Sequence, residues 1–154
     1  MTIGILSDTH GLLRREVLKQ LADCDAVLHA GDFDRPDILE TLRGIAPLYA
    51  VRGNNDGDWA RDLPKTLRLT LDGVSFLMIH DKSQLPVDLG DAQVVVFGHS
   101  HIYLEQQQNG RLWLNPGSCG KARFLLPVTM MRMNIQNGVP QVRKITLPRS
   151  SKEA

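Results

Sequence analysis

The stretch "TIGILSDTHG" at residues 2–11 decides the fold that we predict, because it joins an apolar strand to a polar loop. Residues 12–24, "LLRREVLKQLADC", follow at once with the periodicity of an amphipathic helix. Four aliphatic side chains share one face of that helix: Leu13, Val17, Leu18 and Leu21. A strand that leads directly into such a helix is the βα unit from which parallel sheets are built.

The same alternation continues for the first third of the chain. Residues 26–32, "AVLHAGD", read as a second strand, and residues 47–54, "PLYAVRGN", as a third. Residues 35–44 between them form the second predicted helix, with Pro36 at its start and Gly44 at its end. This order predicts helices that cover a mostly parallel sheet.

After Pro64 the pattern changes to antiparallel hairpins. Turn dipeptides that favour two-residue hairpin loops occur at residues 72–73, 109–110 and 137–138, as Asp-Gly, Asn-Gly and Asn-Gly. Residues 92–101, "AQVVVFGHSH", begin with an apolar strand suited to the middle of a buried sheet. We therefore predict an α/β fold with two facing mixed β-sheets flanked by helices, as one domain over residues 1–148 with a flexible C-terminal tail at 149–154.

Composition bounds the classes of function. With 154 residues, 23% of them charged, and a net charge of +1, the chain has no strong field that favours nucleic acid or an anionic membrane as a general partner. Its longest apolar runs, "FLMI" and "VVVF", are far shorter than the roughly 18 residues of a membrane-spanning helix. Without a recognisable secretory signal, we expect a cytoplasmic protein. Cys24 and Cys119 lie in no metal-binding or redox motif, so we expect reduced thiols.

Five of the apolar segments end in a polar side chain that is able to bind a metal. In open α/β sheets the carboxyl ends of strands form the ligand crevice, so side chains at these ends converge although they are distant in sequence. The predicted set is Asp8, His10, Asp32, Asn54, His80, His99 and His101. Only His29 among the five histidines lies inside a strand, where a structural role is favoured over orientation of a metal ligand.

Local spacing supports this convergence. Two pairs, Asp8 with His10 and His99 with His101, have a spacing of two residues, which in extended backbone directs both side chains to one side. Glycines at 31, 53 and 98 directly precede Asp32, Asn54 and His99, where they permit a close backbone approach. Taken singly, Asp8 could instead cap the following helix and "GHSH" could end a strand without binding metal. The coincidence of all five segments favours a metal site.

The donor types indicate the class of metal. Imidazole, carboxylate and one amide oxygen, without thiolate, suit Mn²⁺, Ni²⁺, Fe²⁺, Zn²⁺ or Mg²⁺ better than a structural zinc cage. Seven donors exceed the needs of one tetrahedral ion. Two ions roughly 3.5 to 4 Å apart, bridged by a carboxylate, would use the whole set and form the clamp that suits phosphoryl transfer.

The ordered blocks D-x-H, G-D, G-N, H and G-H-x-H closely resemble the calcineurin-like metallophosphoesterase superfamily. The resemblance extends from residue 3 to about residue 120. The short length, "GNND" at 53–56 and "NPGS" at 115–118 look like its small prokaryotic, YfcE-like phosphodiesterase branch.

This resemblance implies an enzyme with two divalent ions, Mn²⁺ being the first expectation. It assigns one ion to Asp8, His10, Asp32 and His101. It assigns the other to Asp32, Asn54, His80 and His99. A hydroxide between the ions would attack a phosphodiester, with catalytic roles for Asp8, Asp32, Asn54 and His99. Candidate substrate contacts are Arg52, Asn55 and Ser118.

The substrate and the assembly stay open at this point. Cyclic nucleotides, nucleic-acid ends, phospholipid-derived diesters and small phosphomonoesters all fit such a clamp, with nucleic acid only as a candidate substrate and no membrane partner. A homodimer or homotetramer would match the family. Trp113, Phe124 and Leu125 are candidate interface residues, although core packing is the commoner fate of such side chains.

Two positions depart from the family pattern. Asn55 stands where larger members have a histidine and the small branch often has a cysteine, and an amide cannot act as a general acid near neutral pH. Asp81 follows His80 where glycine is usual, which affects the predicted shape of the substrate pocket. Asp56 and Asp58 read as turn residues, with orientation of a ligand as a second role for Asp56.

Three other functions compete with a phosphodiesterase. A phosphomonoesterase would use the same ions, and a protein-binding scaffold like the eukaryotic retromer subunit would use the same fold with a degraded metal site. The complete ligand set of this chain favours an enzyme over the scaffold. A metal-free nucleotide-binding domain is disfavoured, because neither GxGxxG nor a P-loop motif is present.

Overall fold

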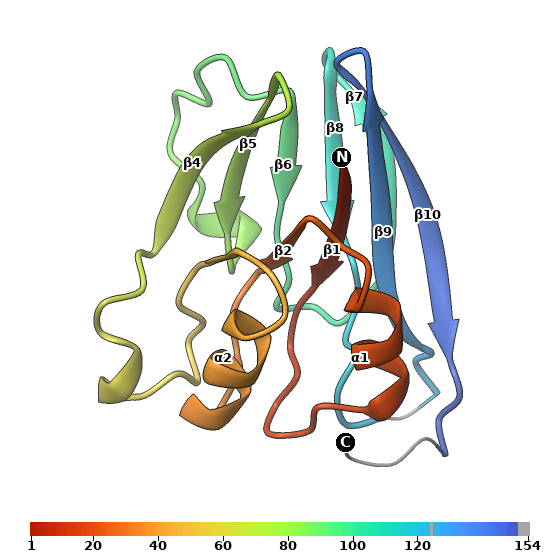
Figure 1. The fold of residues 1–154 in the computed structure, drawn as a ribbon. Helices are drawn as coiled ribbons and strands as arrows, with labels where there is room; N and C mark the ends of the chain where they lie inside the picture. Colours follow the sequence, from red (N-terminus) through yellow and green to blue (C-terminus); the bar gives the residue numbers. More distant parts are fainter. Residues whose placement is uncertain (124, 151–154) are drawn as a thin grey trace.

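The computed structural model describes residues 1–123 and 125–150, which form two facing β-sheets of five strands each (Figure 1). The strand orders are β10-β9-β1-β2-β3 in the first sheet and β4-β5-β6-β8-β7 in the second. Both sheets contain parallel and antiparallel pairs. The predicted fold class, α/β with two facing mixed sheets, is therefore confirmed. In the described part of the chain, no helix is long and apolar enough to cross a membrane.

The first sheet is parallel on one side, from its central strand to one edge. Its parallel strands are β1 (Thr2–Leu6), β2 (Ala26–His29) and β3 (Leu48–Ala50). Two long antiparallel strands complete it, β9 (Val128–Gln136) beside β1 and β10 (Val139–Leu147) at the edge. Because β1 and β2 lie side by side in parallel, the loops that follow them meet at one end of the sheet.

The second sheet is built around β6, as its continuous apolar sequence predicts. Its strands are β4 (Thr66–Leu71), β5 (Val74–Ile79), β6 (Val94–Val96), β7 (Leu104–Gln108) and β8 (Arg111–Asn115). The strands β5, β6 and β8 run parallel, and all three residues of β6 are buried. The three predicted hairpins form, with positive φ at Asp72, Asn109 and Asn137.

Two layers of apolar side chains hold the sheets and helices together. Between the sheets, Ile3 and Ile5 of β1 face Phe76, Met78 and their neighbours on the second sheet. The helices α1 (Arg15–Leu21) and α2 (Pro36–Arg43) both pack on the outer face of the first sheet (Figure 1). Val17 of α1 and Leu42 of α2 are fully buried there.

The outer face of the second sheet is covered differently. Leu85, next to the short 3-10 helix η2 (Lys82–Gln84), packs against Val95 and Phe97. The ammonium group of Lys82 lies 5.3 Å from the centre of the Trp113 ring. Trp113 is therefore a packing residue, Leu125 is exposed, and Phe124 lies outside the described residues. A second 3-10 helix, η1 (Asp58–Ala60), follows the loop after β3.

Candidate metal centre

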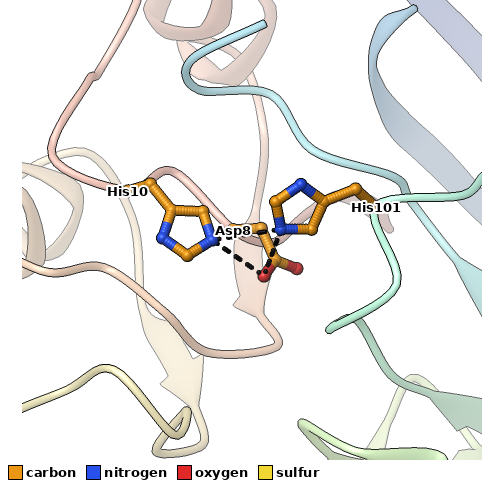
Figure 2. Close-up of side chains that lie close together, drawn as sticks. All are labelled: Asp8, His10 and His101. Carbon is orange, nitrogen blue, oxygen red and sulfur yellow. Dashed lines mark hydrogen bonds and ion pairs between the residues drawn. The ribbon is translucent and has the colours of Figure 1, made fainter. Parts of the chain in front are cut away.

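Five of the seven predicted metal ligands lie together in a buried cluster at the strand ends. Asp8 Oδ1 lies 3.3 Å from His10 Nε2 and 3.2 Å from His101 Nε2 (Figure 2). On its other side, His80 Nε2 lies 3.9 Å from Asp8 Oδ1 and 3.2 Å from Asp32 Oδ2. Two groups of donors that could hold a metal thus share Asp8, one with His10 and His101 and one with Asp32 and His80.

The remaining two predicted ligands form the open rim of this cluster. His99 Nδ1 lies 3.2 Å from Asn54 Oδ1, and 47% of the His99 side chain is exposed. The rings of His99 and His80 meet edge to face, with their centres 5.2 Å apart. His99 and Asn54 are therefore adjacent to the Asp32 and His80 group, on its solvent side.

The backbone at the ligands is not extended, contrary to the spacing argument made from the sequence. Positive φ angles occur at five predicted ligands: Asp8, His10, Asp32, His99 and His101. Side chains at alternate positions converge because the loops turn, and not because a strand continues through them. Residues other than glycine adopt this conformation at a cost of about 1 kcal/mol or more each, and such strain concentrates at functional sites.

Hydrogen bonds between loops stabilise this backbone. The amide of Asp8 donates to Gly31 O, and the amide of His10 donates to Asp32 O, so the loops after β1 and β2 are joined. The loop after β6 joins them through the amide of His99, which donates to Asp8 Oδ2 at 3.1 Å. Predicted ligands from three strand ends are thereby fixed relative to one another.

Glycine is required where these loops touch. A Cβ atom at position 53 would overlap Asp32, and one at position 98 would overlap Ser7 Oγ and lie 2.6 Å from Asp8 Oδ2. A Cβ atom at Gly31 would lie 2.8 Å from His80 Nδ1. The close approach that the sequence predicts at all three glycines is confirmed.

Hydrogen bonds outside the cluster orient the imidazole rings. His80 Nδ1 lies 2.7 Å from Ala30 O, and because a carbonyl only accepts, this nitrogen carries the proton. A neutral His80 therefore presents a lone pair on Nε2 to Asp8 and Asp32. His10 Nδ1 lies 2.9 Å from Asp34 Oδ2, which directs His10 Nε2 into the cluster in the same way.

Two buried atoms of the cluster have no hydrogen-bond partner in the described part of the chain, Asp8 Oδ1 and His80 Nε2. Unpaired buried polar atoms are rare, because each costs about 1 to 3 kcal/mol. Both atoms are electron-pair donors, and both point to the same space. A cation between them would satisfy both, so the residues present fit a divalent metal.

The pKa shifts show how strongly the cluster attracts positive charge. Burial alone would raise the pKa of Asp8, but the nearby imidazoles of His10, His101 and His80 hold it well below its usual range. Burial alone would lower the pKa of His10, but the carboxylates of Asp8 and Asp34 raise it to about 9. The pKa of His80 is raised for the same reason, against burial, by Asp32 and Asp8. Bound protons thus occupy positions that a metal ion would compete for.

Asp56 is the residue whose importance the sequence shows least. Its buried carboxylate accepts hydrogen bonds from four backbone amides, those of Asp32, Phe33, Asp34 and Gly53, at 2.8 to 3.0 Å. It therefore holds the loop that carries Asp32 against the loop that carries Asn54. Its position, two residues after Asn54 in a turn-like stretch, was the only sequence signal for the orienting role.

His29 supports the loops that carry the candidate ligands. Its Nδ1 accepts from the amide of Gly31 at 3.0 Å, so its Nε2 carries the proton and donates to Thr9 Oγ1 at 3.2 Å. The ring stacks on Phe33, with 3.6 Å between the ring centres. Complete burial lowers the pKa of His29 to about 3, and the ring is therefore neutral. These contacts agree with the structural role predicted for it.

The three candidate substrate contacts occupy different places. Arg52 lines a cavity of about 310 Å³ that also reaches Asn54 and His80. Asn55 hydrogen-bonds both oxygens of Asp32, through its backbone amide at 2.8 Å and its side-chain amide at 3.2 Å. Ser118 is buried and donates to Asp8 O at 2.8 Å, so it supports the first ligand loop and does not line this cavity.

Asp81, the second departure from the family pattern, lies beside the rim. Its Oδ1 accepts from the amide and hydroxyl of Ser83, at 2.9 and 2.8 Å, which caps η2. Its Oδ2 lies 3.9 Å from His99 Nε2. Asp81 also lines the same cavity as Arg52.

Comparisons with known proteins agree with this geometry. A protein of Methanothermobacter thermautotrophicus named as a probable metallophosphoesterase is 30% identical, over 97% of this chain and 100% of its own. A phosphodiesterase of Methanocaldococcus jannaschii is 29% identical, over 77% of this chain and 84% of its own.

Solved structures confirm the fold. An archaeal phosphodiesterase superposes with a TM-score of 0.79 at 25% identity, covering 96% of this chain and 100% of the other. Vps29 of Entamoeba histolytica superposes with a TM-score of 0.75 at 19% identity, covering 96% and 100%. The sequence model of the calcineurin-like phosphoesterase superfamily domain matches residues 1–138. The chain therefore belongs to the calcineurin-like phosphoesterase superfamily.

Proposed function

We propose that this protein is a phosphodiesterase that depends on two divalent metal ions. One observation carries the proposal: Asp8 Oδ1 and His80 Nε2, buried and unpartnered within the described residues, face the same space between two aspartates and three imidazoles. Asp8, His10, Asp32 and His101 would hold one ion. Asp32, Asn54, His80 and His99 would hold the other, with Asp32 shared.

The residues of the chain prepare this site for an anionic ester. Bound divalent ions would lower the pKa of a coordinated water and neutralise charge on the phosphate. Asn54 would contribute an amide oxygen without adding negative charge, which keeps the loaded site cationic. His99 and Asn54 lie on the solvent side, so a phosphate would approach past them. A phosphodiester carries one negative charge, and we favour it because it would nearly neutralise the loaded site.

The hydrogen-bond network would keep the ligands in place during turnover. Asp56 fixes the loops of Asp32 and Asn54, and Asn55 donates to Asp32. Ala30 and Asp34 fix the ring orientations of His80 and His10. Because these partners lie outside the cluster, the geometry does not depend on the substrate. A protein-binding scaffold remains the second candidate, since Vps29 shares the fold.

Metal content and activity test the proposal together. We expect the wild-type protein, loaded with Mn²⁺, to contain about two ions per chain and to hydrolyse bis-p-nitrophenyl phosphate. Asp32→Asn should lose metal and lower kcat/KM by more than about 100-fold, because the shared ligand is weakened. Asp62→Asn, the same change at an exposed position, is the control and should change neither quantity.

Two results would contradict the proposal. A wild-type protein that takes up no metal and hydrolyses no ester would favour the scaffold. Faster hydrolysis of p-nitrophenyl phosphate than of the diester, with the same metal content, would identify a phosphomonoesterase instead.

A further inference from the structure

The cavity beside the metal centre contains two cationic side chains that the proposed metal site does not use. Arg52 and Lys65 line it together with Asn54 and His80. Their segments are joined, because the amide of Arg52 donates to the carbonyl of Pro64 at 2.9 Å. Within residues 1–123 and 125–150, neither Arg52 nor Lys65 forms an ion pair with a carboxylate.

The negative group on the cavity wall is already engaged. Asp81 accepts two hydrogen bonds from Ser83 through one oxygen, and its other oxygen faces His99. Arg52 uses one guanidinium nitrogen for a long contact of 3.4 Å to Asp56 O, which leaves its other donors for a ligand. The cavity therefore offers a guanidinium and an ammonium group beside a site for phosphate.

We propose that Arg52 and Lys65 bind a second anionic group on the substrate, so that the enzyme acts on small phosphodiesters with a carboxylate or phosphate on one ester arm. Asn54 and His80 belong both to the metal centre and to the cavity wall, so a phosphate at the metals would direct an ester arm into the cavity. A guanidinium fork and an ammonium group are the donors that carboxylate and phosphate groups select. This inference rests on the proposed phosphodiesterase function.

Cavity size and lining argue for a small, charged arm. About 310 Å³ is at the lower end of the range for small-molecule pockets, which suits a short arm better than a polymer. Among the described residues that line the cavity there is no Phe, Tyr or Trp on which a nucleobase could stack. Ile79 and Gln84 would contact the body of the arm, and the cations would contact its end.

Two esters that differ only in charge test the inference. Both are p-nitrophenyl phosphodiesters, one with a 2-carboxyethyl arm and one with the uncharged 2-carbamoylethyl arm. With the wild-type protein and Mn²⁺, we expect KM for the carboxylate ester to be about fivefold to tenfold lower, as two partly exposed ion pairs allow. Values of kcat should be similar, because the leaving group is the same.

Single variants locate the effect. Arg52→Gln and Lys65→Gln should each reduce the ratio of the two KM values, carbamoyl ester to carboxylate ester, by about threefold. Lys19→Gln removes the same charge on α1 and should leave the preference intact. Circular dichroism of each variant verifies folding, and raising the salt concentration should reduce the wild-type preference.

The outcomes separate the two proposals. Equal KM values for both esters in the wild-type protein would overturn this inference and leave the phosphodiesterase function standing. A preference that survives in both Arg52→Gln and Lys65→Gln would also overturn it. Failure to hydrolyse either ester would overturn the phosphodiesterase function, and this inference with it.

Discussion

Asp56 supports the candidate metal centre without being one of its proposed ligands. Its carboxylate accepts four backbone hydrogen bonds, so Asp56→Asn would replace one acceptor oxygen with a group that repels amide donors. We expect this variant to lower the free energy of unfolding by about 2 to 4 kcal/mol and to weaken metal binding about tenfold. Denaturant unfolding and metal titration measure the two effects.

A matched control exists two residues further along. Asp58 is exposed at the start of η1, so Asp58→Asn should change the unfolding free energy by less than about 0.5 kcal/mol. If Asp56→Asn proves as stable as Asp58→Asn, the hydrogen bonds of Asp56 do not stabilise the loops of Asp32 and Asn54.

We expect His29 to make the stability of the protein depend on pH. Its pKa is about 3 in the folded protein, because of burial, and about 6.5 when the chain is unfolded. The free energy of unfolding therefore does not change with the charge of His29 above about pH 6.5. It falls as the pH decreases from 6.5 towards 3, because in this range only the unfolded chain takes up the proton. At pH 5 the loss from this one group is about 2 kcal/mol relative to pH 7.

His29→Gln isolates this contribution. The variant is expected to be less stable at pH 7, since it loses the stacking on Phe33, but to lose about 2 kcal/mol less than the wild-type protein between pH 7 and pH 5. Urea unfolding of metal-free protein at both pH values measures the difference. An identical loss in both proteins would mean that His29 is protonated in the folded state.

Asn55 bears on the leaving groups that the proposed phosphodiesterase would accept. Its amide groups donate to Asp32, and an amide cannot protonate a departing alkoxide. We expect hydrolysis to slow steeply as the leaving group becomes more basic, and Asn55→His to make this dependence shallower, with a gain of about 100-fold for an alkyl ester. Rates for a series of aryl and alkyl methyl phosphodiesters measure it. Asn55→Gln is the control, and an unchanged slope in Asn55→His would contradict the prediction.

At the scale of elements, the sequence predicts the strands and hairpins better than it predicts which distant strands pair in a sheet. The strand at residues 2–6, the turn at Asn137 and the central position of β6 follow from local apolar patterns and turn residues. The antiparallel pairing of β9 with β1 depends on contacts between residues more than 120 positions apart, for example Ile3 with Met133. Local periodicity contains no information about such a partner.

The candidate site divides in the same way. The convergence of Asp8, His10 and His101 could be predicted because strand ends in one crevice must meet. The positive φ angles at these residues could not, since Asp and His adopt positive φ more often than most residues but still adopt negative φ in most places. Asp56 accepts hydrogen bonds from backbone amides, which almost every residue has. The sequence therefore does not indicate which amides Asp56 binds.

The loop after β6 offers a test of how closely the elements must approach. In Gly98→Ala the new methyl group would overlap Ser7 Oγ and press on Asp8 Oδ2, so this loop must move away from β1. We expect a loss of about 1 to 3 kcal/mol in unfolding free energy and a loss of metal binding. Gly57→Ala is the control, because its methyl group would meet Trp59 at an ordinary 3.5 Å. Normal metal binding by Gly98→Ala would show that the loop tolerates the separation.

At the scale of the whole molecule, the proposed ligands come from both sheets. Asp8, Asp32 and Asn54 follow strands of the first sheet, whereas His80 and His101 follow strands of the second. Bound ions would therefore tie the two sheets together at the end where the loops meet, in addition to the apolar layer between them. Metal binding should accordingly stabilise the entire fold and not only one loop.

Thermal unfolding with and without metal measures this link. A metal at 100 times its dissociation constant adds about 2.7 kcal/mol, which corresponds to a rise of roughly 5 to 10 °C in Tm for a domain of this size. We expect this rise for the wild-type protein on adding Mn²⁺ after treatment with a chelator, and a smaller rise for His80→Ala, which keeps the proposed ligands of the first ion but loses one ligand of the second. A full shift in His80→Ala would show that His80 does not hold an ion that stabilises the fold.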